Sequence, residues 1–285
     1  MSPPFSASGV RRRIGNACMS KITRLNRLPA KEKNEYYSLL IPDSLFERFR
    51  IDKATGQNDA GEQCIDIEAP AGGSEASIQV KRTPSDRDAL FYIEVRDSRD
   101  LVRMFWDFIL VNDPELPRFD TDVTPEGGDR WLNWRRRNHK EEKQALECGL
   151  APGQVRRGMK LTSEFNKCLD VFCQAVGFKS IGLEALFYHN AILYERHGFR
   201  YFDYEKVMRR IHEEFQPGGV LYARLDGSTF RQGWFAESVR GRSWCIHSNI
   251  LDEVWEAGFD PWTPPLMYRM VGQRFSVNTV PGVGY

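Results

Sequence analysis

The chain has 285 residues, of which 41% are hydrophobic and 28% charged. This composition is typical of a folded globular protein and excludes a disordered chain or a fibrous repeat. With 40 basic and 39 acidic residues the net charge is +1, which predicts no general attraction to nucleic acid or to an acidic membrane surface. The sequence holds no apolar run of about 18 residues, so we expect no membrane span.

The first 31 residues carry basic side chains, among them Arg11, Arg12 and Arg13, and no acidic ones. A segment of this kind is typical of a flexible tail or of an organelle transit peptide. We therefore predict a basic flexible leader over residues 1–33 of a cytoplasmic protein, or of an organelle protein if residues 1–31 are a transit peptide. The six cysteines are scattered without a CxxC pair, which favours reduced thiols.

Residues 34–128 form the first predicted domain, a β-rich part with one helix. Its strand-like segments are short and separated by Gly, Pro, Asn and Asp, and the Gly72-Gly73 pair indicates a hairpin, so we expect an antiparallel meander. The predicted strands are 45–51, 64–69, 76–81 and 90–96, and the predicted helix is 97–112. In the loop that follows, Asp120 and Asp122 are interpreted as a solvated acidic turn, with cation binding as the alternative.

Residues 129–285 form the second predicted domain, in which helices and strands alternate. This alternation is typical of α/β proteins. The predicted helices are 131–148, 159–176, 188–197 and one ending at 215, and the predicted strands are 178–186, 199–204 and 220–225. The last sixty residues are rich in Gly, Pro and Trp and predict irregular structure. We therefore predict a mixed α/β fold with an N-terminal antiparallel β-rich part.

Two segments of the second domain contain residues suited to ligand binding or catalysis. Residues 152–161 read PGQVRRGMKL and open a predicted helix, and residues 193–199 read LYERHGF. Unbonded amides at a helix start, together with a glycine, make an anion site. In motif and spacing, residues 150–204 resemble the GNAT superfamily of acyl-CoA-dependent N-acyltransferases.

The resemblance implies a mixed α/β fold that binds acetyl-CoA or a longer acyl-CoA and transfers the acyl group to an amine of a small molecule or a peptide. The amine would attack directly in a ternary complex. The CoA pyrophosphate would lie against the loop, and Tyr194 would protonate the departing thiolate. Glu184, on a predicted strand, is the candidate base. The implied cofactor-binding residues are Arg156, Arg157, Gly158, Met159 and Lys160.

The sequence departs from the family pattern at several positions. Val155 stands where the family has Gln or Arg, and Lys160 stands where it has Gly or Ala. Phe187 replaces an Asn that usually precedes the short helix. The family also has a strand directly before the loop, whereas residues 138–149 predict a helix.

Two other classes of function stay open. The chain could be a non-catalytic ligand-binding protein on a GNAT-like fold, or a metal-dependent enzyme that uses Glu184, His189 and His197. The spacing of these three residues matches neither Glu-x-x-His nor His-Glu-x-x-His, so the predicted site contains no metal. Cys245 and His247 share one face of a possible strand, and we interpret Cys245 as a packed core residue rather than a nucleophile.

Overall fold

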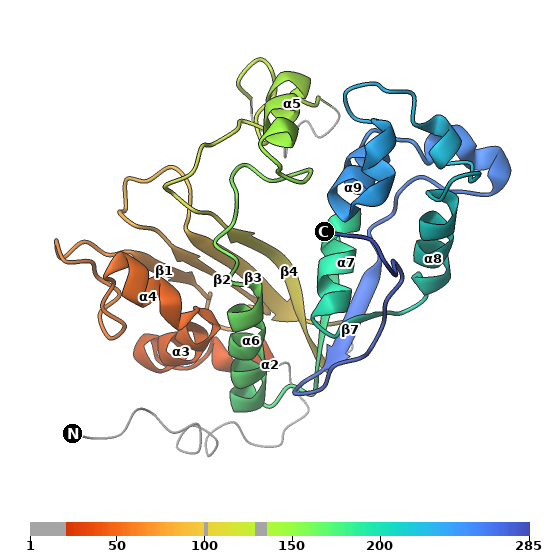
Figure 1. The fold of residues 1–285 in the computed structure, drawn as a ribbon. Helices are drawn as coiled ribbons and strands as arrows, with labels where there is room; N and C mark the ends of the chain where they lie inside the picture. Colours follow the sequence, from red (N-terminus) through yellow and green to blue (C-terminus); the bar gives the residue numbers. More distant parts are fainter. Residues whose placement is uncertain (1–20, 100–101, 129–135) are drawn as a thin grey trace. The chain divides into compact units, whose positions relative to one another are not determined.

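The structure, a computed structural model, describes residues 21–99, 102–128 and 136–285, and its fold is mixed α/β as predicted (Figure 1). The chain divides into two compact units, each built from separate stretches rather than from the two consecutive domains predicted. Unit 1 comprises Met1–Pro114, Gly158–Leu183 and Tyr268–Gln273. Unit 2 comprises Glu115–Arg157, Glu184–Met267 and Arg274–Tyr285.

The sheet has the strand order β1-β2-β3-β4-β5-β7-β6. The first four strands pair antiparallel in unit 1, which confirms the predicted meander. β4 then pairs in parallel with β5, from Arg103 opposite Ser180 to Trp106 opposite Leu183. The strand bounds are β1 Ile65–Glu68, β2 Glu75–Val80, β3 Phe91–Asp97, β4 Arg103–Val111, β5 Ser180–Glu184, β6 Arg200–Tyr201 and β7 Leu266–Met270.

The core of unit 1 lies between the sheet and α6. The Phe165 ring of α6 meets the edge of Trp106 on β4 at 5.0 Å between centroids, and Phe172 stacks on Tyr37 of α3 at 5.8 Å. Such aromatic pairs bury large apolar areas in defined geometry. The helices of unit 1 are α2 Lys21–Leu25, α3 Ala30–Tyr37, η1 Ser38–Leu40, α4 Asp43–Phe49 and α6 Thr162–Val176.

Unit 2 is mainly helical. Its α7 ends before Gly198, whose φ of 86° requires the left-handed conformation that glycine adopts without strain. The predicted irregular C-terminal region contains a regular helix, α9, because Ser238 caps it by accepting from the Gly241 N–H. The helices of unit 2 are α5 His139–Glu147, α7 Tyr188–Arg196, α8 Glu205–Glu214, η3 Tyr222–Arg224, η4 Gly233–Glu237, α9 Val239–His247 and η5 Asp252–Ala257.

Several local predictions were wrong. Within residues 97–112, predicted as a helix, Asp97 ends β3 and Arg103–Val111 form strand β4, because an apolar run can be buried in either structure and its period does not distinguish them. Residues 45–51, predicted as a strand, lie mostly in α4, which begins after Pro42 and ends at Arg50 in the left-handed region. The predicted strand 220–225 contains the 3₁₀ helix η3, and of the predicted helix 131–148 the structure describes α5.

Of the predicted leader, the structure describes residues 21–33, and residues 1–20 lie outside the described residues. In α2, Ile22 and Leu25 are completely buried. The buried carboxylate of Asp97 on β3 accepts hydrogen bonds from the backbone N–H groups of the first three residues of this helix, at 3.0–3.2 Å. Residues 21–26 are therefore packed into the core of unit 1 and are not a flexible tail.

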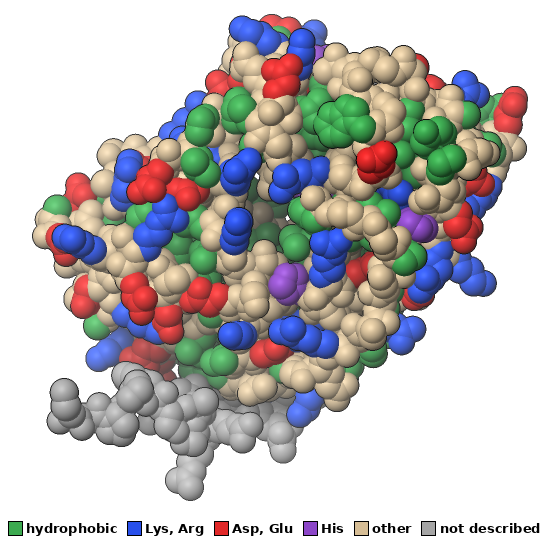
Figure 2. All heavy atoms as spheres, in the orientation of Figure 1, with side chains coloured by type: hydrophobic (Ala, Val, Ile, Leu, Met, Phe, Trp, Pro, Cys, Tyr) green, Lys and Arg blue, Asp and Glu red, His purple; other side chains and the backbone are tan. Residues whose placement is uncertain are grey.

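The surface agrees with the near-zero net charge. Figure 2 shows Lys and Arg side chains interspersed with Asp and Glu on the face in view.

In the loop before α5, Arg118 pairs with both Asp120 and Asp122, the latter at 2.6 Å, so these carboxylates are neutralised by an arginine. No helix in the described ranges has the length and apolar character needed to cross a membrane.

The role of α2 can be measured by truncation. We expect a chain beginning at Lys33 to be less stable by several kcal/mol than one beginning at Lys21. Each buried aliphatic side chain contributes about 1.5–3 kcal/mol, and the Asp97 carboxylate also loses its N–H donors. Urea unfolding of both chains measures the difference, with Ile22→Ala in the longer chain as a milder version. Equal midpoints for the two chains would contradict the structural role of α2.

Candidate functional site

The loop before α6 lies against the end of β4. A Cβ atom at Gly158 would be 3.0 Å from the backbone oxygen of Val111, the last residue of β4, so only glycine permits this approach without a shift. Lys160 follows with φ of 60°, in the left-handed region that disfavours L-residues. This is the position at which the GNAT pattern has Gly or Ala. The loop therefore has the backbone conformation of a glycine-type turn, although it carries a lysine.

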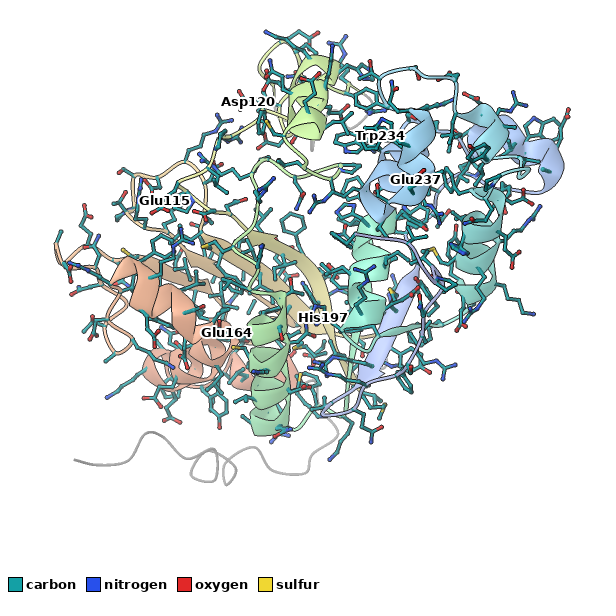
Figure 3. The ribbon with its side chains drawn as sticks, in the orientation of Figure 1. Glu115, Asp120, Glu164, His197, Trp234 and Glu237 are labelled. Atoms are coloured by element: carbon teal, nitrogen blue, oxygen red, sulfur yellow. The ribbon has the colours of Figure 1, made fainter. Side chains whose placement is uncertain are left out.

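The first turn of α6 presents unbonded amides. Leu161 precedes the helix without a side-chain cap, and no group in the described part of the chain accepts from the backbone N–H of Thr162, Ser163 or Glu164. Such amides, with the helix dipole, favour a bound anion. The Glu164 carboxylate (Figure 3) instead binds Ser44 of α4, at 3.0 Å to the N–H and 2.6 Å to the hydroxyl.

The other predicted cofactor-binding residues belong to unit 2. Arg156 donates to the backbone oxygen of Leu116 at 2.5 Å, and Arg157 donates to that of Cys148 at 3.1 Å. Gly158, Met159 and Lys160 belong to unit 1. The predicted motif is thus divided at the boundary of the two units.

The two predicted catalytic side chains also lie in unit 2 and differ in exposure. Tyr194 of α7 is 8% exposed, and its ring centroid is 6.0 Å from that of Phe199. Burial, followed by the nearby Tyr285 hydroxyl, raises the pKa of Tyr194, so this phenol keeps its proton at neutral pH. Glu184 is the exposed last residue of β5.

The residues of the proposed metal site are not arranged to bind a metal. In the part of the chain that the structure describes, which includes Glu184, His189 and His197, no group of three or more His, Cys, Asp or Glu side chains could hold an ion. His189 is buried, with Nδ1 3.0 Å from the Ser243 hydroxyl, and burial lowers its pKa to about 3, assisted by Arg240 and His247. It is therefore a neutral core histidine.

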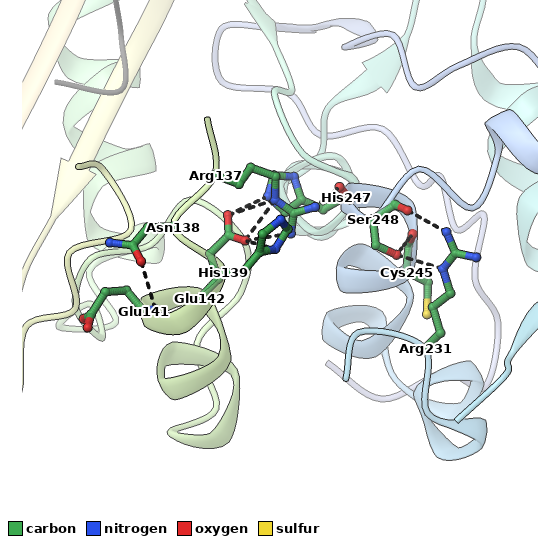
Figure 4. Close-up of polar contacts among 9 residues, drawn as sticks. All are labelled: Arg137, Asn138, His139, Glu141, Glu142, Arg231, Cys245, His247 and Ser248. Carbon is green, nitrogen blue, oxygen red and sulfur yellow. Dashed lines mark hydrogen bonds and ion pairs between the residues drawn. The ribbon is translucent and has the colours of Figure 1, made fainter. Parts of the chain in front are cut away.

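Sequence reasoning missed a buried ionic cluster in unit 2, formed by Arg137, Glu142 and His247 (Figure 4). The completely buried Glu142 of α5 accepts from Arg137 Nε at 2.9 Å and lies 3.1 Å from His247 Nε2 of α9. Burial alone would raise the pKa of Glu142, but hydrogen bonds from His247 and Arg137 outweigh it and lower this pKa to about 2.

Aromatic rings pack against this cluster. The Arg137 guanidinium lies over the Phe230 ring at 5.3 Å, and the His247 ring meets Trp244 edge-on at 5.9 Å. In the sequence, Arg137 and Glu142 lie within the helix predicted over residues 131–148, and nothing nearby in the chain indicates a distant histidine partner. Cys245 is buried in α9, and burial raises its pKa to about 12, which confirms a packed thiol rather than a nucleophile.

Comparisons of the chain with known protein families, with curated proteins and with solved structures found no match.

The cluster predicts a large effect of removing one charge. We expect Glu142→Gln to lower the free energy of unfolding by about 3–5 kcal/mol, because a neutral amide leaves the largely buried side chain of Arg137 without its counter-charge. In the parent protein the stabilisation is present above the ordinary pKa of 4.5 and is lost as the pH falls toward 2, since the folded-state pKa is the lower one.

Urea unfolding at neutral pH and an acid titration followed by circular dichroism measure both effects. The matched control is Glu147→Gln on the same helix, where an exposed carboxylate lies 3.9 Å from Lys143 and is expected to contribute little. A Glu142→Gln protein as stable as the control would contradict the assignment.

Proposed function

We propose that the chain is an acyl-CoA-dependent N-acyltransferase. The observation that carries the proposal is the start of α6, where unbonded amides and the left-handed Lys160 coincide with the segment that resembles the pyrophosphate loop of the GNAT superfamily. The ligand of this anion site is then the pyrophosphate of acetyl-CoA or a longer acyl-CoA.

The order of elements supports the proposal as well. Between Gly158 and Tyr194 the chain forms α6, β5 and α7, which is the sequence of helix, strand and short helix that the motif spacing implies. The family has a strand directly before its loop. Here Asn112 to Arg157 intervene in sequence, yet Gly158 contacts the end of β4 through Val111. Strand β4 is therefore a spatial counterpart of the strand that the family has directly before its loop.

In the proposed reaction, an amine nitrogen of a small molecule or a peptide attacks the thioester carbon directly. The carbon–nitrogen bond forms, the carbon–sulfur bond breaks, and the CoA thiolate leaves. Tyr194 would supply the proton to the thiolate, a role that its raised pKa permits because the phenol stays protonated. Glu184 would take the proton from the amine.

The anion site can be tested at Lys160. We expect Lys160→Glu to weaken CoA binding by tenfold or more, measured by calorimetry, because a negative side chain repels the pyrophosphate. Lys160→Gly should raise the free energy of unfolding by about 1 kcal/mol, since glycine adopts φ of 60° without strain. Gly158 is less suitable, because a Cβ there would press on Val111.

Arg50→Gly is the matched control for Lys160→Gly. Arg50 is also left-handed, with φ of 51°, at the end of α4. We expect the same gain in stability with no change in CoA affinity. Unaltered CoA binding by Lys160→Glu would remove this loop as the cofactor site.

Tyr194→Phe tests the catalytic role. The variant keeps the ring and removes the proton donor, so we expect the acyl-transfer rate to fall by roughly 10²–10⁴-fold with little change in acyl-CoA affinity. The assay follows thiol release from acetyl-CoA with a panel of amines. Tyr201→Phe is the control: this buried tyrosine donates to Glu195, so its loss should cost stability and spare turnover.

Turnover equal to that of the parent protein in Tyr194→Phe would refute the assigned role. CoA binding by the parent protein without transfer to any amine would favour the second candidate, a ligand-binding protein on the same fold.

A further inference from the structure

The arginines of unit 2 that have no acidic partner in the described residues include Arg157, Arg196 and Arg240. Other arginines of the unit pair with carboxylates, such as Arg209 with Glu205 at 2.8 Å. The side chains of Arg157 and Arg196 each donate only to a backbone oxygen, those of Cys148 and Val283 respectively.

Two of these guanidinium groups approach the same space. Gly149 ends α5 with φ of 76°, and a Cβ atom there would lie 3.5 Å from Nη2 of Arg157 and 3.7 Å from Nη1 of Arg240. Arg157 comes from the loop after α5 and Arg240 from the first turn of α9. Two like charges therefore converge beside a residue without a side chain, and no carboxylate in the described residues pairs with either of them.

Arg240 is the member of this group with an unsatisfied buried atom. Its Nε is buried without a hydrogen-bond acceptor, and its guanidinium lies 5.5 Å from the ring centroid of Tyr285. Arg196 lies 5.3 Å from the same ring. A buried donor without an acceptor destabilises the folded protein, because it has lost its hydrogen bond to water. Arg240 also helps to lower the pKa of His189, after burial itself.

We propose that Arg157 and Arg240 bind a phosphate group, with Arg196 at the margin of the site. A dianionic phosphate balances two guanidinium groups and accepts several charge-assisted hydrogen bonds, whereas a carboxylate balances one. The site does not depend on acyl transfer. The phosphate is that of a free ion or that of a phosphorylated ligand such as CoA, which carries a 3′-phosphate.

The first test measures thermal unfolding of the full chain with inorganic phosphate, acetate or sodium chloride at matched ionic strength. We expect phosphate to raise the midpoint more than the other two salts, because a ligand of the native state stabilises it. Arg240→Gln and Arg157→Gln should each weaken phosphate binding by about tenfold to a hundredfold. Both variants should also melt at or above the parent temperature without phosphate, since a repulsion is removed.

Arg209→Gln is the matched control, because this arginine is exposed and paired; its phosphate response should equal that of the parent protein. A parent response to phosphate no larger than that to chloride overturns the proposal. So does a lower midpoint in Arg240→Gln with an unchanged phosphate response, which is the result for a structural arginine. Arg157→Gln, at an exposed position, provides a readout if the first variant does not fold.

Comparison of CoA with 3′-dephospho-CoA identifies the source of the phosphate. Tighter binding of CoA that is abolished by Arg240→Gln assigns the site to CoA, and equal binding with an intact phosphate response assigns it to another phosphate ligand. A phosphate response in a chain without acyl transfer would keep this inference and remove the proposed function. Acyl transfer without a phosphate response would do the reverse.

Discussion

The parallel pairing of β4 with β5 is the constraint on which the architecture depends. Parallel strands cannot be joined by a tight turn, so the chain leaves β4 at Val111 and must return along a face of the sheet before it enters β5. Helix α6 makes that return and covers the sheet with Phe165. The start of α6 therefore lies at the carboxyl end of β4, the edge at which α/β sheets bind ligands. The unbonded amides at the start of α6 therefore lie at this edge of the sheet.

The arginines of unit 2 lie in two kinds of surroundings, with and without a carboxylate partner. Around Glu142, the charge of Arg137 is matched by a carboxylate and enclosed by aromatic rings, so the cluster joins α5 to α9 within the core. Beside Gly149, Arg157 and Arg240 converge with no carboxylate partner in the described chain. A matched charge contributes to the fold, whereas an unmatched one costs stability unless a ligand supplies the opposite charge. This difference distinguishes a structural cluster from a binding site.

The segment that contains α6, β5 and α7 was predicted well because its signals are local. Gly177 and Gly198 have φ of 91° and 86° and end α6 and α7, as the apolar period followed by glycine indicated. The strand β4 was mistaken for a helix, since its run of apolar residues lacks polar alternation. Residues 21–33 were mistaken for a tail because the prediction rested on their basic side chains. It did not take into account Ile22 and Leu25, the two buried residues of α2.

The sequence by itself determined the loop before α6 and the order of α6, β5 and α7, because caps and periodicity act within a few residues. It also determined that Tyr194 lies on a short helix closed by a glycine. Only the tertiary structure decided that Glu142 meets a histidine 105 residues away and that Arg157 meets Arg240. Contacts between residues so far apart in the sequence depend on which helix faces pack together. Local sequence patterns do not determine which faces these are.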